Sequence, residues 1–151
     1  AANASSISDG ASALILASQE AADQQGIKPL ARMLGHTTHS RHPSEFTIAP
    51  VGAIEKLMKK LDWGVNDVDL FEINEAFAVV TLMAMDDLGL PHDKVNVFGG
   101  ACAQGHPIGS TGSRIIATLI HALRTKGGKR GIASLCIGGG EATAVAVELI
   151  D

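Results

Sequence analysis

A glycine-rich loop at residues 99–112 constrains the fold of this chain more than any other stretch. The loop reads GGACAQGHPIGSTG, with five glycines in fourteen residues and one histidine, His106. Glycines at this density let a backbone approach a ligand closely and adopt conformations that other residues avoid. An apolar run at residues 94–98 precedes the loop, and apolar residues with helical spacing follow it from residue 115 to residue 123. The pattern predicts a strand, a glycine loop and a helix in succession.

The loop does not match the common nucleotide-binding patterns. A phosphate-binding loop needs G-x-x-x-x-G-K-[ST], and the dinucleotide fingerprint needs G-x-G-x-x-G. This loop instead spaces its glycines as G-x-x-x-G-x-x-G from Gly105 and places the imidazole of His106 among them. An imidazole suits proton transfer near neutral pH. The alternative is a loop histidine that only caps backbone groups, and the loop by itself favours neither.

Composition excludes several classes of function. The 151 residues are 46% hydrophobic, enough for one domain with a real core. The formal net charge is -4 and no cluster of Lys and Arg occurs, so we expect no nucleic-acid partner. No apolar run reaches the roughly 18 residues of a membrane span, so we expect no membrane partner. The chain begins with neither a methionine nor a recognisable signal peptide. We expect a cytoplasmic protein, or an organellar one whose true N-terminus is absent from this sequence.

Neither the cysteines nor a group of histidines predicts a metal site. Cys102 and Cys136 lie in no zinc-binding spacing, and two cysteines in so long a chain suit a reducing compartment. His36, His39 and His42 recur every third residue, but their stretch is rich in Thr, Ser and Pro and is expected to be a loop without a regular scaffold. We therefore expect no metal.

Periodicity divides the rest of the chain into alternating strands and helices. Expected strands cover residues 13–17, 30–34, 68–73, 94–98, 131–136 and 141–150; expected helices run from Ser18 to Gly26, from Pro50 to Gly64, over 75–88 and over 110–124. Alternation of this kind indicates βαβ units, whose crossovers make neighbouring strands parallel. The expected fold is α/β, with a layered, mostly parallel sheet flanked by helices.

Three polar or reactive groups follow strands that should end at one edge of this sheet. They are Asn74, the loop that holds His106, and Cys136, and open α/β sheets bind ligands at that edge. An imidazole near a thiol favours the thiolate, and the backbone N–H groups of residues 138–140 could stabilise an oxyanion. Taken singly, Cys136 could be a small buried hydrophobe and Asn74 a helix N-cap. Their convergence favours a site.

Three motifs in this sequence resemble those of the thiolase family. They are Asn-Glu-Ala-Phe-Ala at 74–78, Gly-His-Pro-Ile-Gly at 105–109 with Gly112, and Cys-Ile-Gly-Gly-Gly at 136–140. The match runs from residue 3 to residue 148 and is closest to the acetyl-CoA acetyltransferases. The resemblance implies a thiolase-like fold, of which residues 29–151 would form the C-terminal domain. Residues 1–28 would be the end of the N-terminal half, comprising a turn that contacts CoA, the last strand and the last helix.

The resemblance also implies roles for four residues at the sheet edge. His106 would activate a nucleophilic cysteine and protonate the departing CoA thiolate. Cys136 would be the acid and base that takes a proton from C2 of the second acetyl-CoA. Asn74 would hold a water that stabilises an oxyanion together with His106, and the N–H of Gly138 would belong to a second oxyanion hole.

Three further residues would contact the substrate by the same resemblance. Ser5 would contact the pantetheine arm of CoA, and Ala76 and Phe77 would line its tunnel. The implied partners are acyl-CoA, an N-terminal thiolase half and other copies of the chain in a homodimer or homotetramer. The resemblance implies no cofactor, since the CoA thioesters are substrates.

The implied reaction is the condensation of two acetyl-CoA to acetoacetyl-CoA, or the thiolysis of 3-ketoacyl-CoA. The family's nucleophilic cysteine does not occur in this chain, and Cys102 occupies a position usually filled by an apolar residue, so the chain alone is expected to be inactive. A ketoacyl synthase fits less well, because those enzymes pair His with His or Asn and lack a base cysteine in Cys-Ile-Gly-Gly-Gly. The alternative from another class is a non-catalytic thiolase-like protein that binds acyl-CoA or lipid.

Overall fold

The structure, a computed structural model, describes residues 2–150 and contains one four-stranded sheet between helices. Its elements are, in order, α1 (Gln19–Gln25), β1 (Ala31–Ser40), the 3-10 helix η1 (Pro43–Ile48), α2 (Ala49–Leu61), η2 (Val65–Asp67), β2 (Leu70–Ile73), α3 (Ala78–Leu88), η3 (His92–Lys94), α4 (Ala101–Gln104), α5 (Thr111–Lys126), β3 (Arg130–Ile137) and β4 (Glu141–Leu149). Among the described residues, no helix combines the length and apolarity that crossing a membrane requires.

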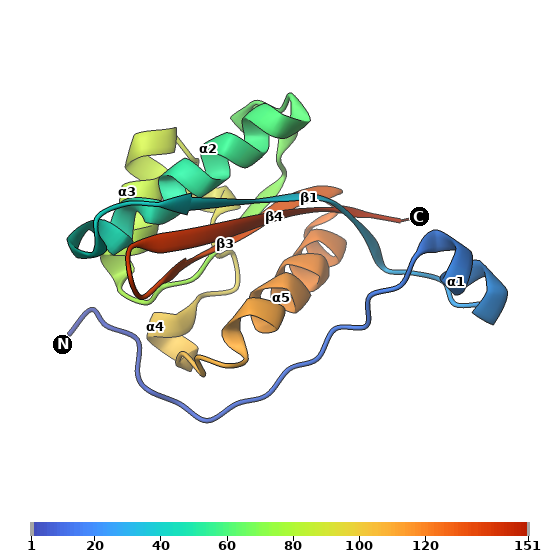
Figure 1. The fold of residues 1–151 in the computed structure, drawn as a ribbon, viewed down its shortest axis with the longest axis horizontal. Coiled ribbons are helices and arrows are strands. Elements are labelled where there is room, and N and C mark those ends of the chain that lie inside the picture. The colour runs from blue at the N-terminus through green and yellow to red at the C-terminus, as the bar shows by residue number, and fades with distance from the viewer. Residues whose placement is uncertain (1, 151) are drawn as a thin grey trace.

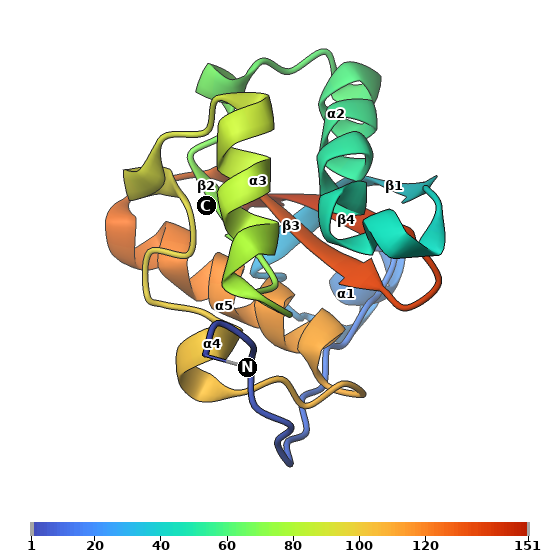
Figure 2. The same ribbon diagram turned by 90° about the vertical axis from the view of Figure 1, so that its left-hand side faces the viewer.

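The helices cover both faces of the sheet, so the molecule has three layers. Figure 1 and Figure 2 show α2 and α3 on one face and α5 on the other. Ile54 and Leu57 of α2 are fully buried against the first face, and Leu119 and Leu123 of α5 against the second. The apolar periodicity of both helices thus faces the sheet, as expected. The predicted α/β class, with a layered sheet flanked by helices, is confirmed.

The expectation of a mostly parallel sheet is wrong. The strand order is β1-β4-β3-β2, and within residues 2–150 β2–β3 is the parallel pair, whereas β3–β4 and β4–β1 are antiparallel. The cause is the short connection at residues 138–140, because a tight turn can join only antiparallel neighbours. The chain between β2 and β3, which includes α3 and α5, is long enough for the parallel crossover.

The N-terminal segment contributes no strand to the sheet, so the expected buried strand at residues 13–17 is wrong. Ile15 is 95% exposed and Leu16 is 75% exposed. Figure 1 shows this segment as a long arc below α4 and α5 that leads into α1. A strand needs a neighbour for its backbone groups, and no strand within residues 2–150 pairs with this stretch. The next helix is as expected, with Ser18 as its N-cap and Gly26 at its end.

β1 is longer than expected and contains two of the three histidines that the sequence pattern predicts to lie in a loop. It pairs with β4 from end to end, with one bulge. His36 and His39 therefore lie on a regular strand, three residues apart and so on opposite faces. His42 caps η1 by accepting a hydrogen bond from Ser44 N. Within the described range, no three His, Cys, Asp or Glu are grouped so that they could hold a metal ion.

The expected strand at residues 94–98 is also wrong, and Asn96 explains why. Val95 makes a single bridge to β2, and Asn96 then takes a left-handed φ of 47° that turns the chain away. Its side chain replaces a strand neighbour, because Oδ1 accepts from Ile73 N and Nδ2 donates to Ile73 O, both at 2.8 Å. Nδ2 also donates to Glu75 Oε1 at 3.0 Å. Asn96 thus bonds to the backbone of the residue before Asn74 and to the side chain of the residue after it.

Two substitutions at Asn96 should destabilise the protein by separable amounts. Asn96→Gly removes three side-chain hydrogen bonds but tolerates the left-handed backbone, and we expect a loss of about 2 kcal/mol in the free energy of unfolding. Asn96→Ala adds backbone strain of roughly 1 kcal/mol. Urea unfolding measures both, with Asp87→Ala on the exposed face of α3 as the control. Wild-type stability in both Asn96 variants would contradict this role.

Candidate active site

Asn74 and Cys136 lie at the same end of two neighbouring strands. Asn74 directly follows β2, is 1% exposed, and its backbone N donates to Ser134 O of β3 at 2.9 Å. Cys136 lies two residues further along β3 and is also buried. Because β2 and β3 are parallel, their carboxyl ends meet at one edge of the sheet. Asn74 is not the N-cap of α3, since that helix begins at Ala78 after Phe77.

His106 approaches Asn74 from the glycine loop. Its Nε2 lies 3.5 Å from Asn74 Nδ2, a long hydrogen bond. The loop is fixed by the N-terminal segment, since His106 N donates to Ser6 O at 3.0 Å. Gly105 has a φ of 94°, and a Cβ there would overlap the Ser8 side chain. The close approach that the glycines suggested is therefore made, at this position, to the chain's own N-terminal segment.

The other side of the imidazole is held by Thr111 at the start of α5. His106 Nδ1 lies 2.6 Å from Thr111 Oγ1, which donates to Pro107 O at 3.0 Å. Both ring nitrogens thus meet side chains, which argues against a histidine that only caps backbone groups. Burial, and next the positive charge of Arg114, lower the pKa of His106 from its usual value. The neutral ring can therefore accept a proton near neutral pH.

Cys136 shares the edge with this pair but does not bond to it. No side-chain hydrogen bond within residues 2–150 joins Cys136 to Asn74 or His106; its side chain packs in the core between the sheet and the α2–α3 layer. Burial raises the pKa of the Cys136 thiol, so the thiol is the resting form at neutral pH. Asn74 and His106 are therefore in direct contact. Cys136 is placed near Asn74 only because their strands, β3 and β2, pair with each other.

The three residues predicted to contact substrate lie together. Ser5 donates from both its backbone N and its Oγ to Ala76 O, each at 3.1 Å. Ala4 forms a β-bridge with Phe77, whose ring is partly exposed and meets Phe46 edge-on. The N-terminal turn thus pairs with residues 76–77 before α3 begins, which is why α3 starts later than the expected residue 75.

Gly138 and Cys102 stand apart from the Asn74–His106 contact. Gly138 is exposed in the turn after β3, with open space around its α-carbon, so its assignment to an oxyanion hole stays a prediction. Cys102 is exposed, and its pKa is raised by desolvation and by the carboxylate of Glu75. A raised pKa disfavours the thiolate that a nucleophile needs, which agrees with leaving Cys102 out of the site.

Two charged residues next to Asn74 belong to none of the motifs found in the sequence. Arg114 Nη2 donates to Asn74 Oδ1 at 3.3 Å, and Glu72 is 2% exposed on β2. Desolvation raises the pKa of Glu72 to about 7, against the opposing effect of Arg114. The signal was present in the helical spacing, because Thr111, Arg114 and Ile115 fall on one face of α5. A cation on a buried helical face could have been recognised as paired with a buried group.

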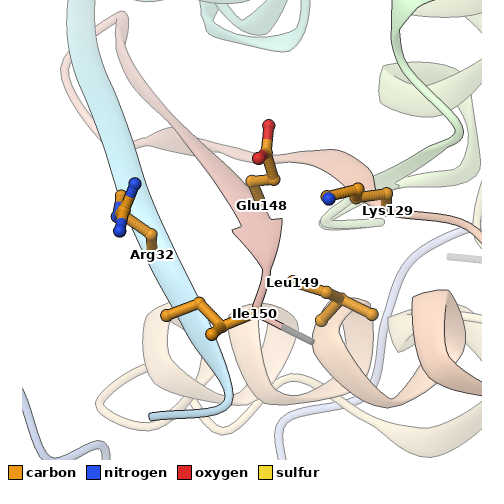
Figure 3. A pocket seen from close by; sticks show the side chains of 5 residues that line it. All are labelled: Arg32, Lys129, Glu148, Leu149 and Ile150. Atoms are coloured by element: carbon orange, nitrogen blue, oxygen red, sulfur yellow. The ribbon is translucent and has the colours of Figure 1, made fainter.

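One surface hollow lies away from the site, and another lies next to it. The hollow in Figure 3, of about 200 Å³, is lined by Arg32, Lys129, Glu148, Leu149 and Ile150. It lies at the opposite end of β3 from Cys136 and so is not part of the site. The other, of about 300 Å³, adjoins the site, since Glu75, Asn96 and Cys102 line it together with residues of α3.

The comparisons with known proteins agree with this geometry. The family model described as "Thiolase, C-terminal domain" matches residues 27–149. The acetyl-CoA acetyltransferase of Chromobacterium violaceum is 50% identical over 98% of this chain and 38% of the relative. The cytosolic acetyl-CoA acetyltransferase of Mus musculus is 47% identical over 97% of this chain and 37% of the relative. The chain thus spans less than two fifths of the length of these relatives.

Solved structures show the same fold. The Bacillus anthracis acetyl-CoA acetyltransferase has a TM-score of 0.95 at 46% identity, over 98% of this chain and 38% of that one. Human mitochondrial 3-ketoacyl-CoA thiolase in complex with CoA has a TM-score of 0.96 at 45% identity, over 99% of this chain and 38% of that one. With the family model matching most of its length, this chain belongs to the thiolase family.

Proposed function

We propose that this chain is the C-terminal part of an acyltransferase that condenses two acetyl-CoA to acetoacetyl-CoA, or cleaves 3-ketoacyl-CoA by thiolysis. The observation that carries the proposal is the contact of Asn74 Nδ2 with His106 Nε2, at the sheet edge where Cys136 also lies. The names of the relatives, acetyl-CoA acetyltransferase and 3-ketoacyl-CoA thiolase, support it.

In the proposed first half-reaction, His106 acts as base and then as acid. Its Nε2 takes the proton of a nucleophilic cysteine supplied from outside this chain, and the thiolate attacks the carbonyl carbon of acetyl-CoA. As the bond between that carbon and the CoA sulfur breaks, His106 returns the proton to the CoA thiolate. Asn74 holds a water that stabilises the oxyanion together with His106. The lowered pKa of His106 suits the step in which it accepts the proton.

In the proposed second half-reaction, Cys136 handles the proton on C2 of another acetyl-CoA. Its thiolate takes that proton, and the carbanion attacks the acetyl group on the enzyme and displaces the nucleophilic cysteine as a thiolate. The proton held by Cys136 then passes to that thiolate, which restores both groups. The raised pKa of Cys136 makes its thiolate, once formed, a strong base. The N–H of Gly138 is the proposed oxyanion donor for this step. Thiolysis follows the same steps in reverse.

The proposal extends to ligands, partners and location. Ser5, Ala76 and Phe77 would follow the pantetheine arm, and no cofactor would act besides the CoA thioesters that are substrates. An N-terminal half would supply the nucleophile and cover the exposed Ile15 and Leu16, since exposed apolar patches mark contact surfaces. The assembly would be a homodimer or homotetramer in the cytoplasm, although one relative carries the name of a mitochondrial enzyme.

Replacing His106 tests its role in both directions of the reaction. In the complete protein, His106→Ala should lower the turnover of acetoacetyl-CoA thiolysis and of acetyl-CoA condensation by at least about a hundredfold, because a positioned acid and base is lost. His36→Ala, on the exposed face of β1, should leave turnover unchanged. Turnover of the His106 variant within a few fold of wild type would remove it from the mechanism. Binding of CoA without turnover in the wild type would favour the acyl-CoA-binding alternative.

Replacing Cys136 separates the two half-reactions. Cys136→Ser should permit acylation by acetyl-CoA but slow condensation by at least about a hundredfold, so acetyl-enzyme should accumulate and be seen by mass spectrometry. Cys102→Ser serves as the matched control and should turn over normally. An acetyl group found on Cys136 of the wild-type protein would reverse the assignment.

The pH dependence of acylation reports the lowered pKa of His106. Its base form is present above its pKa, so kcat/KM should hold as the pH falls through the usual histidine value of 6.5 and should drop only below it. Glu72, with a pKa of about 7, titrates closer to neutrality, and Glu72→Gln removes that titration. A drop centred above 6.5 that persists in Glu72→Gln would contradict the lowered pKa.

A further inference from the structure

We propose that Arg114 is a positioning residue that orients the side-chain amide of Asn74 and, through it, fixes which nitrogen of the His106 ring carries the proton. The inference rests on the proposed function only for its effect on turnover. The orientation of the amide and the position of the ring proton are properties of the folded protein, and they can be measured without any substrate.

The side-chain amide of Asn74 lies between Arg114 and His106. Arg114 Nη2 lies 3.3 Å from Asn74 Oδ1, while Asn74 Nδ2 lies 3.5 Å from His106 Nε2. A guanidinium carries only donors, so the group that faces it must be the amide oxygen. The amide nitrogen then faces the histidine. Removing Arg114 would remove this reason for the amide to point one way and not the other.

The imidazole of His106 lies between Asn74 and Thr111. Asn74 Nδ2 can only donate, so the neutral ring must present an unprotonated Nε2 to it and carry its proton on Nδ1. Nδ1 then donates to Thr111 Oγ1, and the Thr111 hydroxyl donates to Pro107 O. Four hydrogen bonds from Arg114 to Pro107 thus run in one direction. The unprotonated Nε2 is the nitrogen that the proposed reaction uses as its base.

The charge of Arg114 interacts with the carboxyl groups of two glutamates. Glu72 and Glu75 both oppose the lowering of the Arg114 pKa by burial, and Arg114 in turn opposes the rise in the Glu72 pKa. Arg114 also lowers the pKa of His106, after the larger effect of burial. One cation therefore adds to the effect of burial on the ring and also orders the amide next to it. The charged groups that bear on this ring are Arg114 of α5 and, through it, Glu72 and Glu75.

A purely structural role for Arg114 is a poor explanation of its position. It stands in the first turn of α5, where the helix dipole disfavours a cation. Two of its nitrogens, Nε and Nη1, are buried without a hydrogen-bond partner, which is costly for a charged group. If the residue only attached α5 to β2, its removal would change stability and leave the ring proton of His106 where it is.

Nitrogen-15 NMR of the complete protein with labelled histidine tests the proposal. The two ring nitrogens of a neutral imidazole differ strongly in chemical shift according to which one is protonated, and His106→Ala identifies the signals of His106 among those of the other histidines, five of which lie in this chain. At a pH above the histidine pKa, wild-type His106 should be protonated on Nδ1. A ring protonated mainly on Nε2 would overturn the inference, whether or not the Arg114 variants fold.

Variants at Arg114 test the causal part. Arg114→Met should raise the pKa of His106 and add a population protonated on Nε2, whereas Arg114→Lys, which keeps a charge and a donor, should retain the wild-type signature. Because Arg114→Met removes the cation that opposes the rise in the Glu72 pKa, the double variant Glu72→Gln/Arg114→Met removes both groups and should show the same shift. An unchanged His106 pKa and ring-proton position in the folded double variant would overturn the inference.

The turnover of the same variants provides an independent measurement. Misplacement of a reacting group costs up to about a hundredfold, so kcat should fall between about ten- and a hundredfold in the double variant and be partly restored in Arg114→Lys, with KM little changed. If the complete protein catalyses no thiolase reaction, the proposed function fails while the NMR result still decides this inference. If it is active, a double variant with wild-type kcat would overturn the inference.

Discussion

The parallel pairing of β2 with β3 is the constraint on which the rest of the site depends. The backbone N of Asn74 continues the ladder by donating to Ser134 O at 2.9 Å, so the first residue after β2 is still held by β3. Asn96 holds the residues on either side of Asn74 from the other edge of β2. The backbone of Asn74 therefore has little conformational freedom left. Its side-chain amide can serve as a fixed reference point, which a residue on a free loop could not provide.

The N-terminal segment helps the glycine loop to hold His106. Ser5 donates to Ala76 O, His106 N donates to Ser6 O, and Ser12 Oγ donates to Ser110 O at the start of α5. The arc of residues 5–17 is therefore attached at several points although it joins no sheet. This explains why a segment with exposed apolar side chains still follows one path. The domain boundary expected near residue 28 remains a prediction, but the contacts show that residues before it help to position the histidine.

The helices and the sheet edge were predictable from the sequence, whereas several strands were not. α2 and α5 carry their own signal, because apolar residues at helical spacing need no partner to be recognised. The stretches at 13–17 and 94–98 have the composition of strands, but a strand also needs a neighbour. The first stretch has none within the described residues, and the second is interrupted by the left-handed Asn96.

The motifs identified Asn74, His106 and Cys136, and their roles are tested by experiment rather than by the fold. Arg114 was missed because a search for apolar periodicity passes over a cation on the buried face of a helix.

The charges beneath the site are difficult to explain by stability. Burying an ion pair costs several kcal/mol per ion in desolvation, and apolar residues of similar volume are often as stable or more so. Here the cost is compounded, since two nitrogens of Arg114 lack partners and Glu72 is almost fully buried. An apolar pair at these positions could pack α5 against β2, but it could not distinguish the oxygen of the Asn74 amide from its nitrogen. A guanidinium can, because it only donates. What Arg114 supplies is therefore direction, which passes from Asn74 to the ring of His106 and leaves Nε2 as its unprotonated nitrogen.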